Sequence, residues 1–160
     1  MALYAMWVPG SAALGQPGMY ARGFPGGAQY STEDHRDTGF ITATIPTPVI
    51  VNGRRTHLVK VFVLYRTEAL PGEEVRLVSV AVHDGSRLVR RREDWAQGDY
   101  TSGLWPENVM DFPDLPDVQF GIQVALEFKT ATPGVRGTLV CCGFGADFDD
   151  AAVPRPILPA

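Results

Sequence analysis

Aromatic rings and planar polar groups are concentrated in one stretch of the sequence, residues 93–117. A sugar ring presents apolar C–H patches together with hydroxyl groups, so aromatic rings beside carboxylates and amides suit it. The pattern predicts a lectin-like ligand site in this long loop. The candidate binding residues are Trp95, Asp99, Tyr100, Trp105, Glu107 and Asn108. In the alternative interpretation, the same aromatic rings close the open end of the fold.

Calcium binding is a second candidate chemistry, because aspartates recur at every third position in DFPDLPD. Ca²⁺ takes roughly six to eight oxygen ligands from carboxylates and loop carbonyls. The candidate ligands are Asp111, Asp114 and Asp117, and a second group of aspartates is Asp147, Asp149 and Asp150. The D-x-[DN]-x-[DN]-G calcium loop is absent, and aspartates also stabilise turns through their own backbone. Calcium is therefore the one cofactor that the sequence suggests, and turn formation is the competing explanation.

The sequence lacks the common catalytic motifs. It has no G-x-S-x-G nucleophile motif, no phosphate-binding glycine loop and no pair of histidines at metal-ligand spacing. A small hydrolase could still assemble an acid–base pair from residues far apart in the chain, given carboxyl groups with separated pKa values. The candidates for that alternative are His83, Asp94, Asp99 and Glu107. We assign no catalytic residue and favour a protein that is not an enzyme.

The charge balance argues against nucleic acid as a partner, since the net charge is −4 and the isoelectric point about 5.3. The basic run Arg90-Arg91-Arg92 is interpreted as a solvated strand end. The chain has no apolar stretch of roughly 18–20 residues, which a membrane-spanning helix needs, and no signal peptide is recognised. We expect a cytoplasmic protein without a membrane partner, in which Cys141 and Cys142 are reduced and not joined to each other.

Alternation of apolar and polar residues predicts β-strands along most of the chain. In the segment Val118–Phe128 every second residue is apolar, which predicts a long strand with one face in the core. Residues 136–148 predict the returning strand, with Cys142 and Phe144 on its bulky face and glycines opposite that suggest a bulge or close backbone approach. Residues 57–68 are apolar on both faces, as in a central, covered strand.

Turn residues indicate how these strands connect. The residues 83–86, His-Asp-Gly-Ser, are predicted to form the tip of a tight hairpin, and Asn52-Gly53 a second turn. Pro46 and Pro48 lack the N–H group that a central strand needs, so their segment is an edge strand or a crossing between sheets. The opening LYAMWV is apolar on both sides, which we interpret as a strand in the middle of a sheet.

Composition and turns together favour an all-β fold. The chain contains 17 Gly and 13 Pro, and no segment has a convincing helical period. The predicted architecture is a single-domain antiparallel β-sandwich, jelly-roll or immunoglobulin-like in topology, with a β-barrel as the alternative. Residues 11–38 and 93–117 are its long irregular segments. Residues 1–150 form the predicted domain, and residues 151–160 a proline-rich, extended tail.

Five segments follow one another in a recognisable order: MALYAMWV, IPTPVIVNGRR, HLVKVFVLYRT, VHDG and GFGADF. In these segments and in its length, the chain resembles a family of small bacterial β-rich proteins that carry no assigned function. The resemblance covers most of the chain. It implies one small domain and brings no catalytic or binding residue.

The sequence as a whole favours a non-enzymatic β-sandwich that binds a glycan or a protein partner through residues 93–117. Two alternatives stay open. One is a self-assembling structural protein that forms a homo-oligomer through its N-terminal strand or C-terminal tail. The other is the small hydrolase that uses loop carboxylates. A mass measurement in solution separates self-assembly from ligand binding, and a glycan array separates ligand binding from catalysis.

Overall fold

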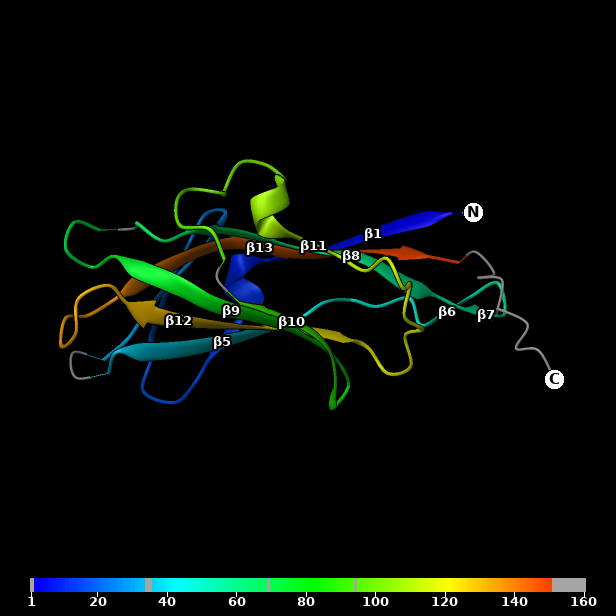
Figure 1. Cartoon of the computed structure of the whole chain (residues 1–160), viewed down its shortest axis with the longest axis horizontal. Helices are drawn as coiled ribbons and strands as arrows, with labels where there is room; N and C mark the ends of the chain where they lie inside the picture. Colours follow the sequence, from blue (N-terminus) through cyan, green and yellow to red (C-terminus); the bar gives the residue numbers. More distant parts are fainter. Residues whose placement is uncertain (1, 34–35, 69, 94, 151–160) are drawn as a thin grey trace.

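The computed structural model shows two antiparallel β-sheets packed against each other (Figure 1), and it describes residues 2–33, 36–68, 70–93 and 95–150. Sheet I contains β1 (Leu3–Pro9), β3 (Tyr20–Phe24), β4 (Gly27–Ser31), β8 (His57–Arg66), β11 (Val109–Asp111) and β13 (Thr138–Asp149). Sheet II contains β2 (Leu14–Gly15), β5 (Thr38–Thr44), β9 (Val75–Asp84), β10 (Arg87–Glu93) and β12 (Ile122–Thr130). The smaller elements are the hairpin β6 (Ile50–Val51) and β7 (Arg54–Arg55) and the 3-10 turns η1 (Gly10–Ala12) and η2 (Pro106–Asn108).

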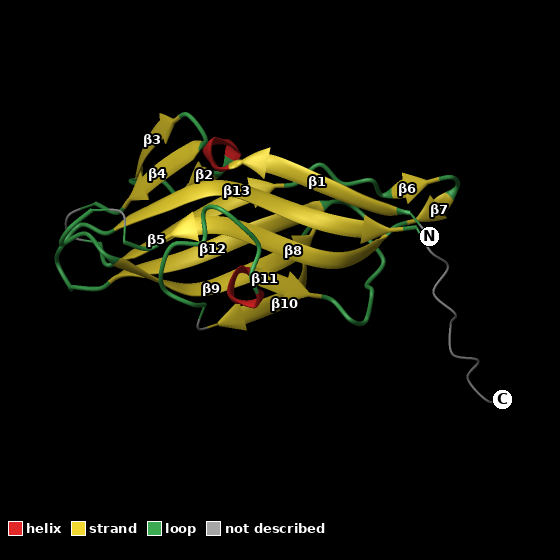
Figure 2. Ribbon diagram, turned by 90° about the horizontal axis from the view of Figure 1, so that it is seen from above, coloured by secondary structure: helices red, strands yellow, loops and turns green. Residues whose placement is uncertain are grey.

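The strand order confirms the predicted all-β sandwich. Sheet I has the order β11-β8-β13-β4-β3, and β1 pairs with β13 on the same side as β4 but further along the strand (Figure 2). Sheet II has the order β10-β9-β12-β5-β2. Both sheets therefore end in edge strands, and they share one core. Its fully buried residues include Val61 and Phe144 from sheet I and Val82, Val124 and Leu126 from sheet II.

The strand predicted from residue 118 onward begins later than expected. From Ile122 to Phe128 the inward residues are fully buried, as predicted. Phe120, however, is 75% exposed, so its predicted place in the core is wrong. The buried carboxylate of Asp84 accepts hydrogen bonds from the backbone N–H groups of residues 119–121, and Gly121 has a φ of +143°. These bonds hold the chain in a turn at this point, which places the Phe120 ring outside.

The returning strand contains the bulge that its glycines suggested. The pairing of β13 with β8 shifts register between Cys141 and Gly143. Because the extra residue exchanges the two faces, Cys141 belongs to the core and Cys142 is half-buried, the reverse of the predicted assignment. Both thiols are free, as predicted. Burial raises the pKa of Cys141 and of Cys142, so neither thiol is activated as a nucleophile.

The N-terminal strand lies at an edge of sheet I, so the prediction of a central, covered strand is wrong for β1. Among the described strands its partner is β13, with Leu3 opposite Asp149 and Pro9 opposite Gly143. Its residues alternate between half-buried and exposed, and the exposed set includes Leu3 and Trp7. The alternation of exposure shows that one face of β1 packs on the core, while the other remains on the surface.

The predicted turns are present, and one predicted loop contains strands. The tight hairpin joins β9 to β10 with Gly85 at a φ of +60°, and the Asn52-Gly53 turn joins β6 to β7. The proline-rich segment after β5 leads from sheet II to β8 in sheet I, which is the predicted crossing. Residues 11–38 are not one irregular segment, because β3 and β4 form a hairpin there. Within the described residues no helix is long and apolar enough to cross a membrane.

Candidate binding site on the outer face of sheet I

The segment 93–117 runs along the side of sheet I and does not close one end of the sandwich. Asp99 forms a bridge with Arg66 at the last residue of β8, and Asp117 forms one with His57 at the first residue. Between them, β11 pairs with the middle of β8. A ten-residue strand spans about 30 Å. The predicted sugar-binding residues therefore lie beside the last residues of β8, where Asp99 pairs with Arg66 and Asn108 donates to the Val63 carbonyl. The predicted calcium ligands follow along β8 toward its first residue.

Trp95 is part of the core, with 2% of its surface exposed. Its ring meets Tyr65 edge to face at 6.2 Å between centroids, and the Arg92 guanidinium lies 4.9 Å from the ring centroid. The indole Nε1 donates to the Arg92 carbonyl at 3.1 Å. The ring therefore has almost no surface to offer a ligand, and packing accounts for its presence.

Asn108 is fully buried and organises the loop around it. Its Nδ2 donates to the carbonyl oxygens of Val63 at 3.1 Å and Gly103 at 3.0 Å, and its Oδ1 accepts from the Trp105 backbone N–H at 2.7 Å. Because the amide uses both its donors and its acceptor inside the protein, Asn108 does not reach a ligand. Its role is to fix the turn that carries Trp105.

The acid–base candidates for a hydrolase do not converge. Asp99 is exposed. The hydroxyl and the backbone N–H of Thr101 both donate to its carboxylate, and these bonds hold the pKa of Asp99 below its usual value. His83 lies near the opposite end, because it pairs with Gln123 one residue before the Asp84 turn. Glu107 is exposed on η2, and Asp94 lies outside the described residues. This geometry offers no support for the hydrolase alternative.

The three aspartates predicted to bind calcium face different partners. Asp111 lies 3.5 Å from the Lys60 ammonium group, and Asp117 lies 2.9 Å from Nδ1 of His57. Asp114 lies in a separate hollow of about 360 Å³ beside β10. No group of three or more His, Cys, Asp or Glu side chains among the described residues could hold a metal ion. The regular spacing in the sequence does not become a shared site, because the segment is extended along β8.

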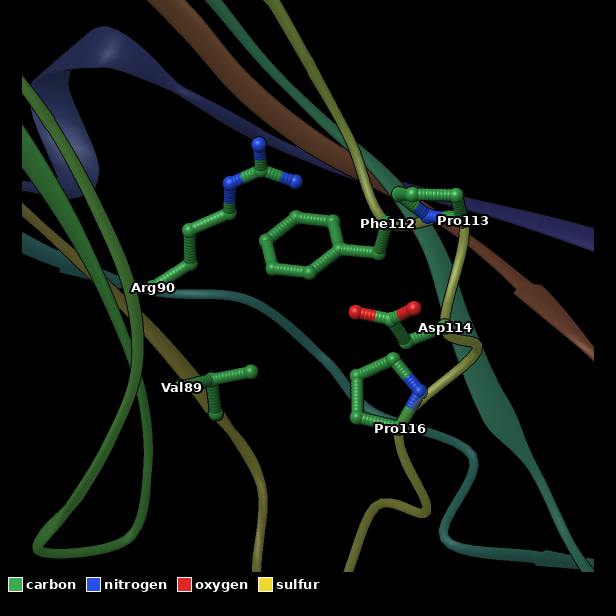
Figure 3. Close-up of a pocket in the computed structure, with 6 residues that line it drawn as sticks. All are labelled: Val89, Arg90, Phe112, Pro113, Asp114 and Pro116. Atoms are coloured by element: carbon green, nitrogen blue, oxygen red, sulfur yellow. The ribbon is translucent and has the colours of Figure 1, made fainter.

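An arginine lines one side of the hollow around Asp114 (Figure 3). The Asp114 carboxylate points into the hollow between the Phe112 ring and Pro116, and the Arg90 side chain extends over the Phe112 ring. The Arg90 guanidinium lies 5.9 Å from the Phe112 centroid and donates to the Asp111 carbonyl at 2.7 Å. Arg92 similarly donates to the carbonyls of Pro106 and Val109. These arginines join the edge of sheet II to the edge of sheet I, which is a structural role.

On the other side of β11, a shallow hollow of about 320 Å³ lies on the outer face of sheet I. Its lining residues are Lys60, Phe62, Leu104, Trp105, Pro106, Val109, Asp111 and Asp147. Trp105 is 40% exposed and Leu104 is 48% exposed. A volume of this size accommodates a small ligand. Of the predicted sugar-binding residues, only Trp105 lines the hollow.

A second tryptophan adjoins this hollow and was not predicted as a site residue. The Trp7 ring stacks on Phe62 with centroids 5.0 Å apart and planes at 19°. Both rings lie over Gly145, where a Cβ would come within 2.7 Å of each. The glycine therefore leaves room for the two aromatic rings to stack on each other over β13, with Trp7 still 42% exposed. We call Trp7, Phe62, Leu104 and Trp105 the outer platform.

Strand register places a charged row beside the apolar row of the platform. Across the sheet, Trp7, Gly145, Phe62 and Val109 are aligned, and the next outward row is Ala5, Asp147, Lys60 and Asp111. Residues two apart on a strand point to the same face at a spacing of about 7 Å. Burial raises the pKa of Asp147, and the nearby Lys60 partly offsets this. The outer face therefore presents flat rings beside two carboxylates and an ammonium group.

The comparisons with known proteins add no functional label to this geometry. No protein-family model matches the chain, and no curated protein matches it significantly. The residues of the outer platform are therefore the basis of the functional argument. Sequence reasoning missed Trp7 because the opening strand is apolar on both sides. The available signal was the pair of glycines on the returning strand, at residues 143 and 145, which predicted a close approach.

Proposed function

We propose that this protein is a non-enzymatic sugar-binding module that holds its ligand on the outer platform. The observation that carries the proposal is the pair of parallel rows on sheet I, one apolar and one charged. A sugar ring lying on Trp7 and Trp105 would present its apolar C–H face to the indoles. Its hydroxyl groups would then reach the second row, where the carboxylates accept hydrogen bonds and Lys60 donates.

The exposure of the side chains in the two rows supports ligand binding more than a purely structural packing role. Trp7 and Trp105 are each about two-fifths exposed, so their rings are held in place while part of each faces water. The side chains of Lys60 and Asp111 are 45% and 68% exposed and lie 3.5 Å apart, which leaves further donor and acceptor positions open to a ligand. Rigid, partly exposed aromatic rings give contact area at low entropic cost. The proposal therefore retains the lectin-like function and places its site on a different surface.

A glycan array with matched variants tests the proposal. We expect the wild-type protein to retain at least one class of glycan, and Trp105→Ala to weaken that binding by about tenfold or more, about 1.4 kcal/mol. Phe120→Ala is the control. This ring is 75% exposed, but it lies on the turn that precedes β12 and is not part of the outer platform. It should bind as the wild type does. Absence of any glycan bound by the wild type, or equal loss in both variants, would refute the proposal.

A further inference from the structure

The edges of the two sheets are protected to very different degrees. At β11, Arg90 donates to the Asp111 carbonyl and Arg92 donates to the Val109 carbonyl. These contacts cover the β11 edge of sheet I. The strand β10 carries five charged side chains in seven residues (RLVRRRE), and β2 is two residues long. The strand β3 has Arg22 at its centre. Charged side chains, short strands and covered edges all prevent pairing with another chain.

The strand β1 has none of these protections. Its seven residues, LYAMWVP, carry no charge, and among the described strands only β13 pairs with it. Figure 2 shows β1 at the rim of sheet I, alongside β13. In an antiparallel pair, alternate residues direct their N–H and C=O groups away from the partner. Half of the backbone groups of β1 therefore point outward along an uncharged edge, with Leu3 61% and Trp7 42% exposed beside them.

The residues of β1 are also complementary to themselves in one antiparallel register. If Ala5 lies opposite Ala5 of a second copy, Leu3 lies opposite Trp7 and Tyr4 opposite Met6. A large apolar side chain then lies beside another on the outer face, while the two Ala5 residues, the smallest in the strand, meet at the symmetry axis. Pro9, which lacks an N–H group, falls outside the paired region. A two-fold arrangement requires this kind of self-complementary surface.

We infer that two copies of this chain pair antiparallel through β1, with Ala5 at the two-fold axis, so that sheet I continues across the dimer. An uncharged strand suits a second copy of itself, because the same side chains meet without repulsion of like charges. The pairing brings Leu3 of each copy beside Trp7 of the other, so the two outer platforms lie on one continuous face. This inference needs no sugar and stands independently of the proposed function.

Analytical ultracentrifugation of the full chain tests the inference, in the absence of any ligand. The wild type should sediment at twice the monomer mass of 17.4 kDa. Ala5→Lys should sediment as a monomer, because two ammonium groups would meet at the axis. This position is exposed and lies opposite Asp147, so the fold should tolerate the lysine. Leu14→Lys is the control, since Leu14 is 77% exposed on β2 and should leave the dimer intact.

A charge-swap experiment separates lost pairing from misfolding. Ala5→Glu alone should also be monomeric, and an equimolar mixture of Ala5→Lys with Ala5→Glu should recover the dimer mass. Recovery is expected only if residue 5 of one copy lies beside residue 5 of the other. A monomeric wild type at millimolar concentration would overturn the inference. So would a dimer that persists in Ala5→Lys, because its interface would then lie elsewhere.

Discussion

Trp95 and Trp105 belong to the same irregular segment but occupy opposite environments. Trp95 is 2% exposed, donates a hydrogen bond from its indole and is enclosed by Tyr65 and Arg92. Trp105 is 40% exposed, lies over Gly103 and lines the hollow on sheet I. The comparison shows that an aromatic residue in a long loop is not by itself a binding residue. Its role depends on whether the loop passes into the core or over the outer face.

The largest expected effect separates the two tryptophans by stability. Trp95→Ala removes a fully buried ring and should lower the free energy of unfolding by about 3–5 kcal/mol. Trp105→Ala should cost less than about 2 kcal/mol, because part of that ring already faces water. Urea unfolding followed by circular dichroism measures both values. Equal losses in the two variants would show that Trp105 is also a packing residue.

The next effect concerns Asn108, which connects the buried and exposed parts of the segment. Asn108→Ala leaves the Val63 and Gly103 carbonyls and the Trp105 N–H without their partner, and an unsatisfied buried group costs about 1–3 kcal/mol. The variant should lose both stability and glycan binding, since the turn no longer fixes Trp105. Gln119→Ala, which truncates an exposed amide, is the control for both measurements. Unchanged binding in Asn108→Ala would contradict a role in positioning Trp105.

A smaller effect tests the platform from beneath its rings. Gly145→Ala places a Cβ within 2.7 Å of Trp7 and Phe62, and overpacking of this kind costs about 1–3 kcal/mol. Because Trp7 is partly exposed, its ring can move away, so the stack should be lost with moderate destabilisation and weaker glycan binding. Gly23→Ala is the matched control, since a Cβ there meets nothing within 4 Å. If both variants bind glycans as the wild type does, the Trp7–Phe62 stack is not part of the site.

The smallest expected effect is a pH dependence of glycan affinity at the outer platform. Burial raises the pKa of Asp147 above the ordinary value of 3.8, so this carboxylate takes up a proton earlier as the pH falls. Glycan affinity should therefore weaken on acidification, as the Asp147 carboxylate takes up a proton and stops accepting hydrogen bonds from the ligand. Asp147→Asn should bind with little dependence on pH over the same range. A wild-type affinity that stays constant through this titration would remove Asp147 from the site.

The strands could be predicted because their pattern is local. The buried positions of β12 from Ile122 to Phe128 follow from period-two alternation, and the hairpin turns follow from glycine and asparagine. The faces of Cys141 and Cys142 could not be assigned, because a bulge in β13 depends on its pairing with β8. The start of β12 was predicted too early, so that Phe120 was placed inside the strand. The reason is similar, because a carboxylate from another strand, Asp84, fixes the turn at Phe120.

The candidate site was only partly predictable, because its residues come together through pairing across the sheet. The sequence identified Trp105 as a binding residue and Asp111 as a calcium ligand, and the structure brings these two to one hollow. It could not distinguish Trp105 from Trp95, which has the same kind of neighbours in the chain. Trp7 lies nearly a hundred residues before Trp105, and strand register alone aligns it with Phe62 through Gly145.

The central claim is that the exposed tryptophans bind the ligand and the buried one does not. The three indole N–H signals in a proton–nitrogen NMR spectrum report on Trp7, Trp95 and Trp105 within a single sample. During titration with methyl β-glucoside, methyl β-galactoside or the glycan selected by the array, the signals of Trp7 and Trp105 should shift. The Trp95 signal should stay in place, because its N–H is buried and bonded to the Arg92 carbonyl. No shift with any of these sugars, or a shift of Trp95 alone, would contradict the account.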